Sequence, residues 1–176
     1  KLKKIIEKTK PSYIVDFASN CNVNLSWIKT KEINEINYLN KIDLIKFISK
    51  ENFLKKYIYI STPEVFGSNI NFVKENSRNY NPSSPYATSK LSFELFLNNY
   101  YKSFNFPLII SRFSNFYGPN QSTNRLIPQL VLKIIKREKF VLQGNGNFIR
   151  SYIYKDDLVS GIEKMITKGK PGYTYH

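Results

Sequence analysis

The sequence predicts an α/β fold in which a doubly wound parallel sheet is covered by helices on both faces. Two observations predict it. Short apolar runs of strand length alternate along the chain with longer segments whose apolar residues recur at helical spacing. The runs at 13–17, 57–61 and 108–112 are nearly continuous rather than alternating, which is typical of strands buried on both faces. Alternation of this kind favours parallel strands joined by crossover helices.

The first half of the chain is expected to supply two helices, two strands and a long loop. Residues 2–8 form a charged run with helical spacing, and strands are expected at 13–17 and 57–61. A longer helix is expected at 35–49, because its apolar residues are spaced for one helix face: Ile36, Leu39, Leu44, Ile45 and Ile48. Residues 69–85 are mostly polar and contain two prolines, so they are expected to form a loop.

The second half continues the alternation. Helices are expected at 85–103, 125–137 and 158–167, and strands at 108–112, 140–142, 148–152 and 172–176. The helical pattern of 85–103 begins at Tyr86, after a loop that holds Pro82 and Pro85, and its apolar residues are Leu91, Phe93, Leu95, Phe96 and Leu97. Asp156 and Asp157 are expected to cap the helix that begins at Leu158, since carboxylates accept hydrogen bonds from the free N–H groups of a helix start.

Polar side chains follow three of the expected strands. Ser19, Thr62 and Asn115 each come just after a strand end. Ligands of open α/β sheets bind beyond the carboxyl ends of the strands. If these strands are parallel, the three residues converge on one crevice.

A tyrosine and a lysine one helical turn apart follow the second of these strand ends. Of the 13 tyrosines, Tyr86 alone has a lysine four positions on, Lys90. Positions i and i+4 share a helix face. A tyrosine pKa near 10 is too high for a base at neutral pH, and a neighbouring ammonium lowers it. The pair is therefore suited to removing a proton from a hydroxyl, with Thr62 at the strand end positioned to hold that hydroxyl by a hydrogen bond.

Composition argues against several other classes of protein. The net charge of +14 permits nucleic-acid binding, but lysine dominates the 27 basic residues, which are scattered and accompany no recognised binding motif. Cys21 is the one cysteine and His176 the one histidine, so neither an intrachain disulfide nor a zinc site is expected. No apolar run is long enough to cross a membrane, and no signal peptide is visible. These features favour a cytoplasmic protein without a membrane partner.

Several segments, in the right order and covering nearly the whole chain, resemble those of the extended short-chain dehydrogenase/reductase family, the NAD-dependent nucleotide-sugar epimerases and dehydratases. Besides Tyr86-x-x-x-Lys90, these segments are PSYIVDFAS at 11–19, NYLNKIDLI at 37–45, RFSNFYGP at 112–119 and GNGNFIRSYIY at 144–154. The resemblance implies a Rossmann-like NAD-binding fold with a small substrate-binding lobe, and a dTDP- or UDP-hexose as substrate.

The resemblance also implies roles for individual residues. Catalysis is assigned to Thr62, Glu64, Tyr86 and Lys90. Besides Tyr86 and Lys90, the cofactor-binding residues are Ala18, Ser19, Asn37, Ser61, Phe113 and Ser114. The substrate-binding residues are Asn115, Arg125, Leu126 and Arg150, and no metal is implied.

Glu64 decides which reaction is expected. In the family's 4,6-dehydratases the loop reads T-D-E, and its carboxyl groups act as acid and base to eliminate water across C5 and C6. Decarboxylases of UDP-glucuronate carry T-S-E, and epimerases usually carry small apolar residues. Here Thr62-Pro63-Glu64 keeps the glutamate and loses the aspartate, and Ser151 replaces a second family aspartate. A dehydratase is favoured; an epimerase, a decarboxylase and a catalytically silent binding module remain alternatives.

The glycine-rich turn of a dinucleotide-binding fold is missing from the sequence. No G-x-G-x-x-G occurs, and Ile149 stands where a third glycine after Gly144 and Gly146 is needed. The chain is therefore expected to be a fragment that lacks the first βα units. Residues 1–115 are interpreted as a partial dinucleotide-binding domain, and 116–176 as a partial substrate-binding lobe whose strand and helix return to the core. The resemblance further implies a homodimer.

Overall fold

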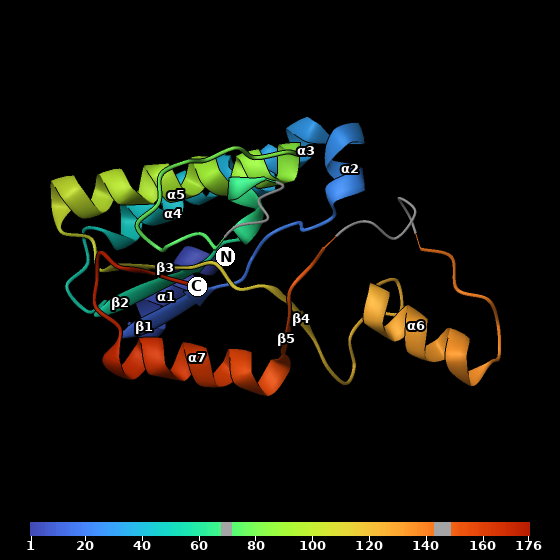
Figure 1. Cartoon of the computed structure of the whole chain (residues 1–176). Helices are drawn as coiled ribbons and strands as arrows, with labels where there is room; N and C mark the ends of the chain where they lie inside the picture. Colours follow the sequence, from blue (N-terminus) through green and yellow to red (C-terminus); the bar gives the residue numbers. More distant parts are fainter. Residues whose placement is uncertain (68–71, 143–148) are drawn as a thin grey trace. The chain divides into compact units, whose positions relative to one another are not determined.

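The computed structural model describes residues 1–67, 72–142 and 149–176. Its centre is a four-stranded parallel sheet with the order β1-β2-β3-β6, seen edge-on in Figure 1. The strands are β1 (Tyr13–Asp16), β2 (Lys56–Ile60), β3 (Leu108–Ser111) and β6 (Thr174–Tyr175). The predicted parallel α/β sheet is confirmed, and so are the strands expected at 13–17, 57–61, 108–112 and 172–176, to within one or two residues at each end.

Helices connect the strands, and two further strands pair with each other. The α-helices are α1 (Leu2–Thr9), α2 (Val23–Ile28), α3 (Thr30–Asn34), α4 (Asn40–Ile48), α5 (Pro85–Phe104), α6 (Leu126–Ile135) and α7 (Lys155–Lys168). A π-helix, η1 (Glu35–Leu39), joins α3 to α4, and a 3₁₀-helix, η2 (Pro63–Phe66), follows β2. The parallel strands β4 (Asn115–Tyr117) and β5 (Tyr152–Tyr154) form a second, two-stranded sheet.

Two hydrophobic clusters explain why both faces of the sheet are covered. On one face, Tyr57, Tyr59, Leu108 and Ile110 pack against α4 and α5, through residues that include Phe93. On the other face, the alternate strand residues Ile58 and Ile109 pack against Met165 of α7. Because neighbouring strand residues point to opposite faces, nearly continuous apolar strands are needed to fill both clusters. The arrangement makes the α/β fold doubly wound.

The chain divides into two compact units. Unit 1 comprises residues 1–113 and 162–176, and unit 2 comprises residues 114–161. The division passes through α7. Unit 1 therefore holds the four-stranded sheet with α4 and α5, and unit 2 holds the two-stranded sheet and α6.

Several expectations about single elements are wrong. Residues 140–142 are not a strand, and the strand expected at 148–152 lies at Tyr152–Tyr154 instead. Helix α7 begins at Lys155, so Asp156 and Asp157 lie in its first turn and not at the capping position. Their carboxylates still favour the helix start, because the N–H groups of the first turn carry partial positive charge. Residues 143–148, which include all of GNGNF (144–148) from the predicted segment at 144–154, lie outside the described residues.

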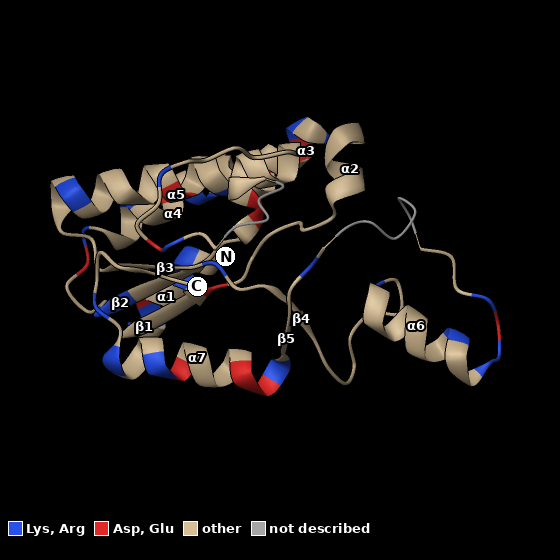
Figure 2. Cartoon of the chain, viewed as in Figure 1, with Lys and Arg blue, Asp and Glu red and all other residues tan. Residues whose placement is uncertain are grey.

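The charged residues are spread over several elements. Figure 2 shows Lys and Arg on α1, α5, α6 and α7 as well as on connecting segments. No helix in the described ranges is long and apolar enough to cross a membrane. Within those ranges, no three His, Cys, Asp or Glu side chains gather at a spacing suited to a metal ion.

Candidate active site

Helix α5 presents Tyr86 and Lys90 next to the end of β2. The helix starts at Pro85, and the side chain of Ser84 accepts a hydrogen bond from the N–H of Ala87 (3.1 Å). This cap fixes the first turn, in which Tyr86 lies. Tyr86 is 8% exposed and Lys90 1% exposed. Only a small part of either side chain is therefore exposed to solvent. This is a requirement for a site that excludes most water.

Lys90 is held against the strand end, and its surroundings lower its pKa. Its Nζ donates to the carbonyl oxygen of Ile60 (2.7 Å) and lies 4.3 Å from the ring centre of Tyr59. Burial, followed by the nearby ammonium of Lys41, lowers the pKa of Lys90 to about 7. An ammonium with this pKa can both stabilise a phenolate on Tyr86 and take part in proton transfer near neutral pH.

Thr62 and Glu64 lie on the turn that follows β2. Thr62 precedes η2, and its Oγ1 accepts a hydrogen bond from the N–H of Glu64 (3.2 Å). Pro63 supplies the first residue of the turn, while the buried side chains of Val65 and Phe66 anchor its far end. Thr62 is buried and Glu64 half-buried. The local sequence thus places a hydroxyl and a carboxylate at the end of the same strand that binds Lys90.

Asn37 joins the loop after β1 to helix α5. Its Nδ2 donates to the carbonyl of Asn20 and to Oγ of Ser89 (both 3.0 Å), and its Oδ1 accepts from the N–H of Asn20 (2.8 Å). Ser89 in turn donates to the carbonyl of Tyr86 (2.7 Å). The residue was expected near a helix start, but it lies in the π-helix η1, in the middle of a longer helical segment. π-Helical turns occur often at functional sites.

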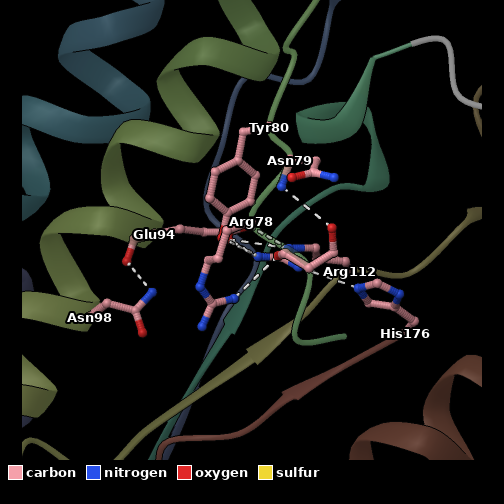
Figure 3. A network of polar contacts seen from close by, with 8 residues as sticks. Arg78, Asn79, Tyr80, Glu94, Asn98, Arg112 and His176 are labelled. Atoms are coloured by element: carbon pink, nitrogen blue, oxygen red, sulfur yellow. Dashed lines mark hydrogen bonds and ion pairs between the residues drawn. The ribbon is translucent and has the colours of Figure 1, made fainter. Parts of the chain in front are cut away.

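A buried ion pair fixes α5 to the end of β3. Arg112 binds Glu94 with Nη2 to Oε2 at 2.6 Å and Nε to Oε1 at 3.1 Å, and neither side chain is exposed (Figure 3). Its guanidinium also donates to the hydroxyl of Tyr80 (3.2 Å) and lies 4.9 Å from the ring centre of Phe66. Arg112 thereby links the helix that carries Tyr86 to the turn that carries Glu64.

The remaining predicted residues divide between the two units. In unit 1, Ala18 and Ser19 follow β1, and the half-buried Phe113 packs against the cluster around Met165. The predicted residues of unit 2 are Ser114, Asn115, Arg125, Leu126 and Arg150. Asn115 opens β4, Arg125 and Leu126 stand at the start of α6, and Arg150 donates to the carbonyl of Ile149 (3.1 Å). That Asn115 converges with Ser19 and Thr62 stays a prediction.

Comparison with known proteins identifies the family. Residues 1–176 match the model of the NAD dependent epimerase/dehydratase family. The chain belongs to this family. It is 34% identical over 186 residues to the dTDP-D-glucose 4,6-dehydratase of Dictyostelium discoideum, covering 99% of this chain and 43% of that protein. The chain spans about half the length of the curated relatives it matches.

Solved structures of family members share the fold. The dTDP-glucose 4,6-dehydratase of Bacillus anthracis in complex with NAD superposes with a TM-score of 0.87 at 30% identity, covering 99% of this chain and 53% of that one. The UDP-glucuronic acid 4-epimerase of Bacillus cereus, in complex with UDP-glucuronic acid and NAD, gives 0.88 at 26% identity, covering 99% and 55%. The predicted Rossmann-like fold and the predicted family are confirmed.

The residues at this edge of the sheet fit one end of NAD, the cofactor of the family. The hydroxyl oxygens of Ser61 and Ser111 are buried at the ends of β2 and β3, and neither has a hydrogen-bond partner among the described residues. Buried polar groups normally have partners, so these hydroxyls can accept or donate to a ligand. Ser61 directly follows Ile60, whose carbonyl oxygen binds Lys90, so its hydroxyl suits the polar nicotinamide and ribose end of the cofactor. The sequence has no glycine-rich turn for the pyrophosphate.

The two buried ion pairs, Asp16 with Lys41 and Glu94 with Arg112, were not predicted from the sequence. The first pair could have been expected from the sequence pattern. Asp16 is a charge inside an apolar strand, and Lys41 is four residues from Asn37 and from Ile45, on the inward face of its helix. A buried charge requires a partner, so the two could have been expected to pair.

Proposed function

We propose that the natural protein is an NAD-dependent nucleotide-sugar 4,6-dehydratase that acts on a dTDP- or UDP-hexose in carbohydrate biosynthesis. The main support for this proposal is the position of Glu64. It supplies a half-buried carboxylate two residues after Thr62, on the turn that follows β2, close in sequence to the hydroxyl that orients the sugar. The 34% identity to a dTDP-D-glucose 4,6-dehydratase supports the same choice.

The first step oxidises C4 of the sugar. Tyr86 takes the proton of the C4 hydroxyl, and the ammonium of Lys90 stabilises the phenolate that does so. Thr62 orients the hydroxyl by a hydrogen bond. NAD, when bound, accepts the hydride from C4 and later returns it, so the overall reaction is redox-neutral.

The second step removes water. The 4-keto group makes the C5 proton acidic, and Glu64 takes that proton while the C6 hydroxyl leaves. Pro63 has no acidic group, so the leaving oxygen receives its proton from a group other than residue 63. A bound cofactor would then return the hydride to C6, while Glu64 would return a proton to C5.

The substrate's nucleotide end is proposed to bind in unit 2. Arg150 carries a planar guanidinium, which suits bidentate contacts with a diphosphate. Asn115 is proposed to contact the substrate near the diphosphate, and Arg125 and Leu126 the base. All four are at least partly accessible.

Pro63 also supports a second candidate, a nucleotide-sugar epimerase or decarboxylase. Both start with the same C4 oxidation by Tyr86 and Lys90 but need no acid at residue 63. Similarity to the UDP-glucuronic acid 4-epimerase of Bacillus cereus favours this candidate over a catalytically silent binding module. Ser151, which replaces a family aspartate, is the main support for the silent module.

Replacing Glu64 by glutamine tests the role of the carboxylate. In Glu64→Gln we expect elimination to slow by about 10²-fold or more, because the base for C5 is lost. Oxidation at C4 remains, so reduced nicotinamide absorbance builds up when substrate is added. Rapid mixing with absorbance detection, followed by mass analysis of the sugar, measures both steps.

Glu75→Gln is the matched control, because Glu75 is an exposed glutamate of the following loop. It is expected to keep the rate within about twofold, since surface changes away from a site have small effects. If Glu64→Gln eliminates water at the wild-type rate, Glu64 is not the base.

We also propose that the protein is a cytoplasmic homodimer. One cysteine in 176 residues fits a reducing compartment. Helix α5 packs against η1, and this pair leaves apolar side chains exposed: Ile36 (38%), Leu39 (50%) and Leu95 (46%). A self-complementary helix pair of this kind supports a two-fold interface.

Leu95→Glu is expected to convert the dimer into a monomer, because it places a charge in the apolar centre of the interface. Analytical ultracentrifugation of the natural full-length protein measures the change. Lys102→Glu, at the far end of the same helix, is the control and should leave the dimer intact. A wild-type protein that sediments as a monomer at micromolar concentration contradicts the proposal.

A further inference from the structure

A buried charge cluster between β1 and α4 takes no part in the proposed reaction steps. The two oxygens of Asp16 accept four hydrogen bonds: Oδ1 from the N–H of Ala18 and from Lys41 (both 3.0 Å), and Oδ2 from Lys41 and the hydroxyl of Tyr57 (both 2.7 Å). The side chains of Asp16 and Lys41 are 9% and 8% exposed. An apolar pair of similar volume often serves stability as well as a buried ion pair, so stability alone does not explain the cluster.

The ammonium groups of Lys41 and Lys90 both lie near the ring of Tyr59. Asp16 and Tyr59 are partners in the β1–β2 register. The ammonium of Lys41 lies 5.3 Å from the ring centre of Tyr59, and that of Lys90 lies 4.3 Å from the same ring centre. Both cations are within the range of attraction to the ring. The ring therefore brings the two ammonium groups into one electrostatic environment, deep below the surface.

We propose that Asp16 is a positioning residue for the Tyr86–Lys90 pair: it holds Lys41 against the ring of Tyr59, and the Asp16–Lys41 pair sets the electrostatic field at Lys90. Its catalytic meaning rests on the proposed function. Its test on Lys90 does not, because that test needs neither cofactor nor substrate.

The charges that face Lys90 give the direction of the effect. Lys41 on α4 lowers the pKa of Lys90, while Asp16 on β1, Glu94 on α5 and Cys21 in the loop after β1 raise it. If the charge of Asp16 is removed, the ammonium of Lys41 is no longer balanced. A neighbouring positive charge disfavours a second ammonium, so the pKa of Lys90 must fall.

Asp16→Asn in the natural full-length protein tests the inference. Carbon-13 NMR of labelled lysine side chains, assigned with Lys90→Arg, measures the pKa of Lys90 in the absence of ligands. We expect the pKa to fall by on the order of one unit in Asp16→Asn. In Asp16→Asn/Lys41→Met it should return to the wild-type value or slightly above, because Lys41 has the larger influence of the two.

Two further variants keep the test decisive. Tyr57→Phe removes one hydrogen bond to Asp16 without changing a charge, so the pKa of Lys90 should stay within about 0.3 units. If Asp16→Asn does not fold, Lys41→Met alone should raise the pKa. A pKa that does not move in Asp16→Asn, or that stays equally low in the double variant, overturns the inference.

The pH profile separates this inference from the proposed function. In Asp16→Asn the decline of turnover on the alkaline side should begin at lower pH, by a shift similar to that of the Lys90 pKa. A purely structural role of Asp16 lowers stability without moving the profile, and that result overturns the inference. If the NMR shift is found but no nucleotide sugar is turned over, the inference holds and the proposed function fails.

Discussion

Tyr86→Phe is expected to lower kcat by about 10²–10⁴-fold, the usual contribution of a positioned general base. The change removes one oxygen atom from a buried side chain at the start of a capped helix, so the fold should be unaffected. Without the hydroxyl, no group beside Lys90 takes the proton of the sugar's C4 hydroxyl, and the hydride cannot leave C4. The measurement is steady-state turnover of nucleotide sugar by the natural full-length protein, with NAD added.

Tyr100→Phe on the same helix is the matched control. Tyr100 packs among Phe96, Phe104 and Phe106 and takes no part in the proposed chemistry. Loss of the Tyr100 hydroxyl should change turnover by less than about twofold. Equal effects of Tyr86→Phe and Tyr100→Phe on turnover contradict the assignment of Tyr86 as the base.

Arg112→Met is expected to lower the free energy of unfolding by about 3–5 kcal/mol, because it leaves the carboxylate of Glu94 buried without its cation. Both side chains of this pair are fully buried, so solvent does not compensate. The hydrogen bond to Tyr80 and the contact of the guanidinium with the ring of Phe66 are lost as well. Urea unfolding followed by circular dichroism measures the loss.

The double variant Arg112→Met/Glu94→Leu should recover most of that stability, since it removes both charges and keeps the volume filled with apolar groups. If the double variant is as unstable as Arg112→Met, or if Arg112→Met costs less than about 1 kcal/mol, the ion pair does not hold α5 to β3.

The parts of the fold that local pattern determines could be predicted. The strands at 13–16, 56–60 and 108–111 are nearly continuous apolar runs, and the residues of α5 carry helical spacing. Helices α2 and α3 were not predicted, because each is only five or six residues long and gives too few apolar repeats to show a period. The apolar run at 140–142 resembled a strand, yet strands exist only where a partner strand supplies hydrogen bonds.

The same distinction applies to the candidate site. Tyr86 and Lys90 are four residues apart, so their proximity follows from helix geometry alone. Asp16 and Lys41 are 25 residues apart and Glu94 and Arg112 are 18 apart, and their pairing depends on how strands and helices pack. The partners of Asn37 could not be predicted either, because the π-helix that directs its side chain gives no recognisable sequence pattern.

The most direct test of the proposed dehydratase activity is the mass of the product. The natural full-length protein is incubated with NAD and, in separate reactions, with dTDP-glucose, UDP-glucose and UDP-glucuronate. We predict that one of the glucose nucleotides loses one water and that this loss disappears in Glu64→Gln. An unchanged mass with an altered sugar in the NMR spectrum, or the loss of carbon dioxide from UDP-glucuronate, contradicts the dehydratase assignment and makes the protein an epimerase or a decarboxylase.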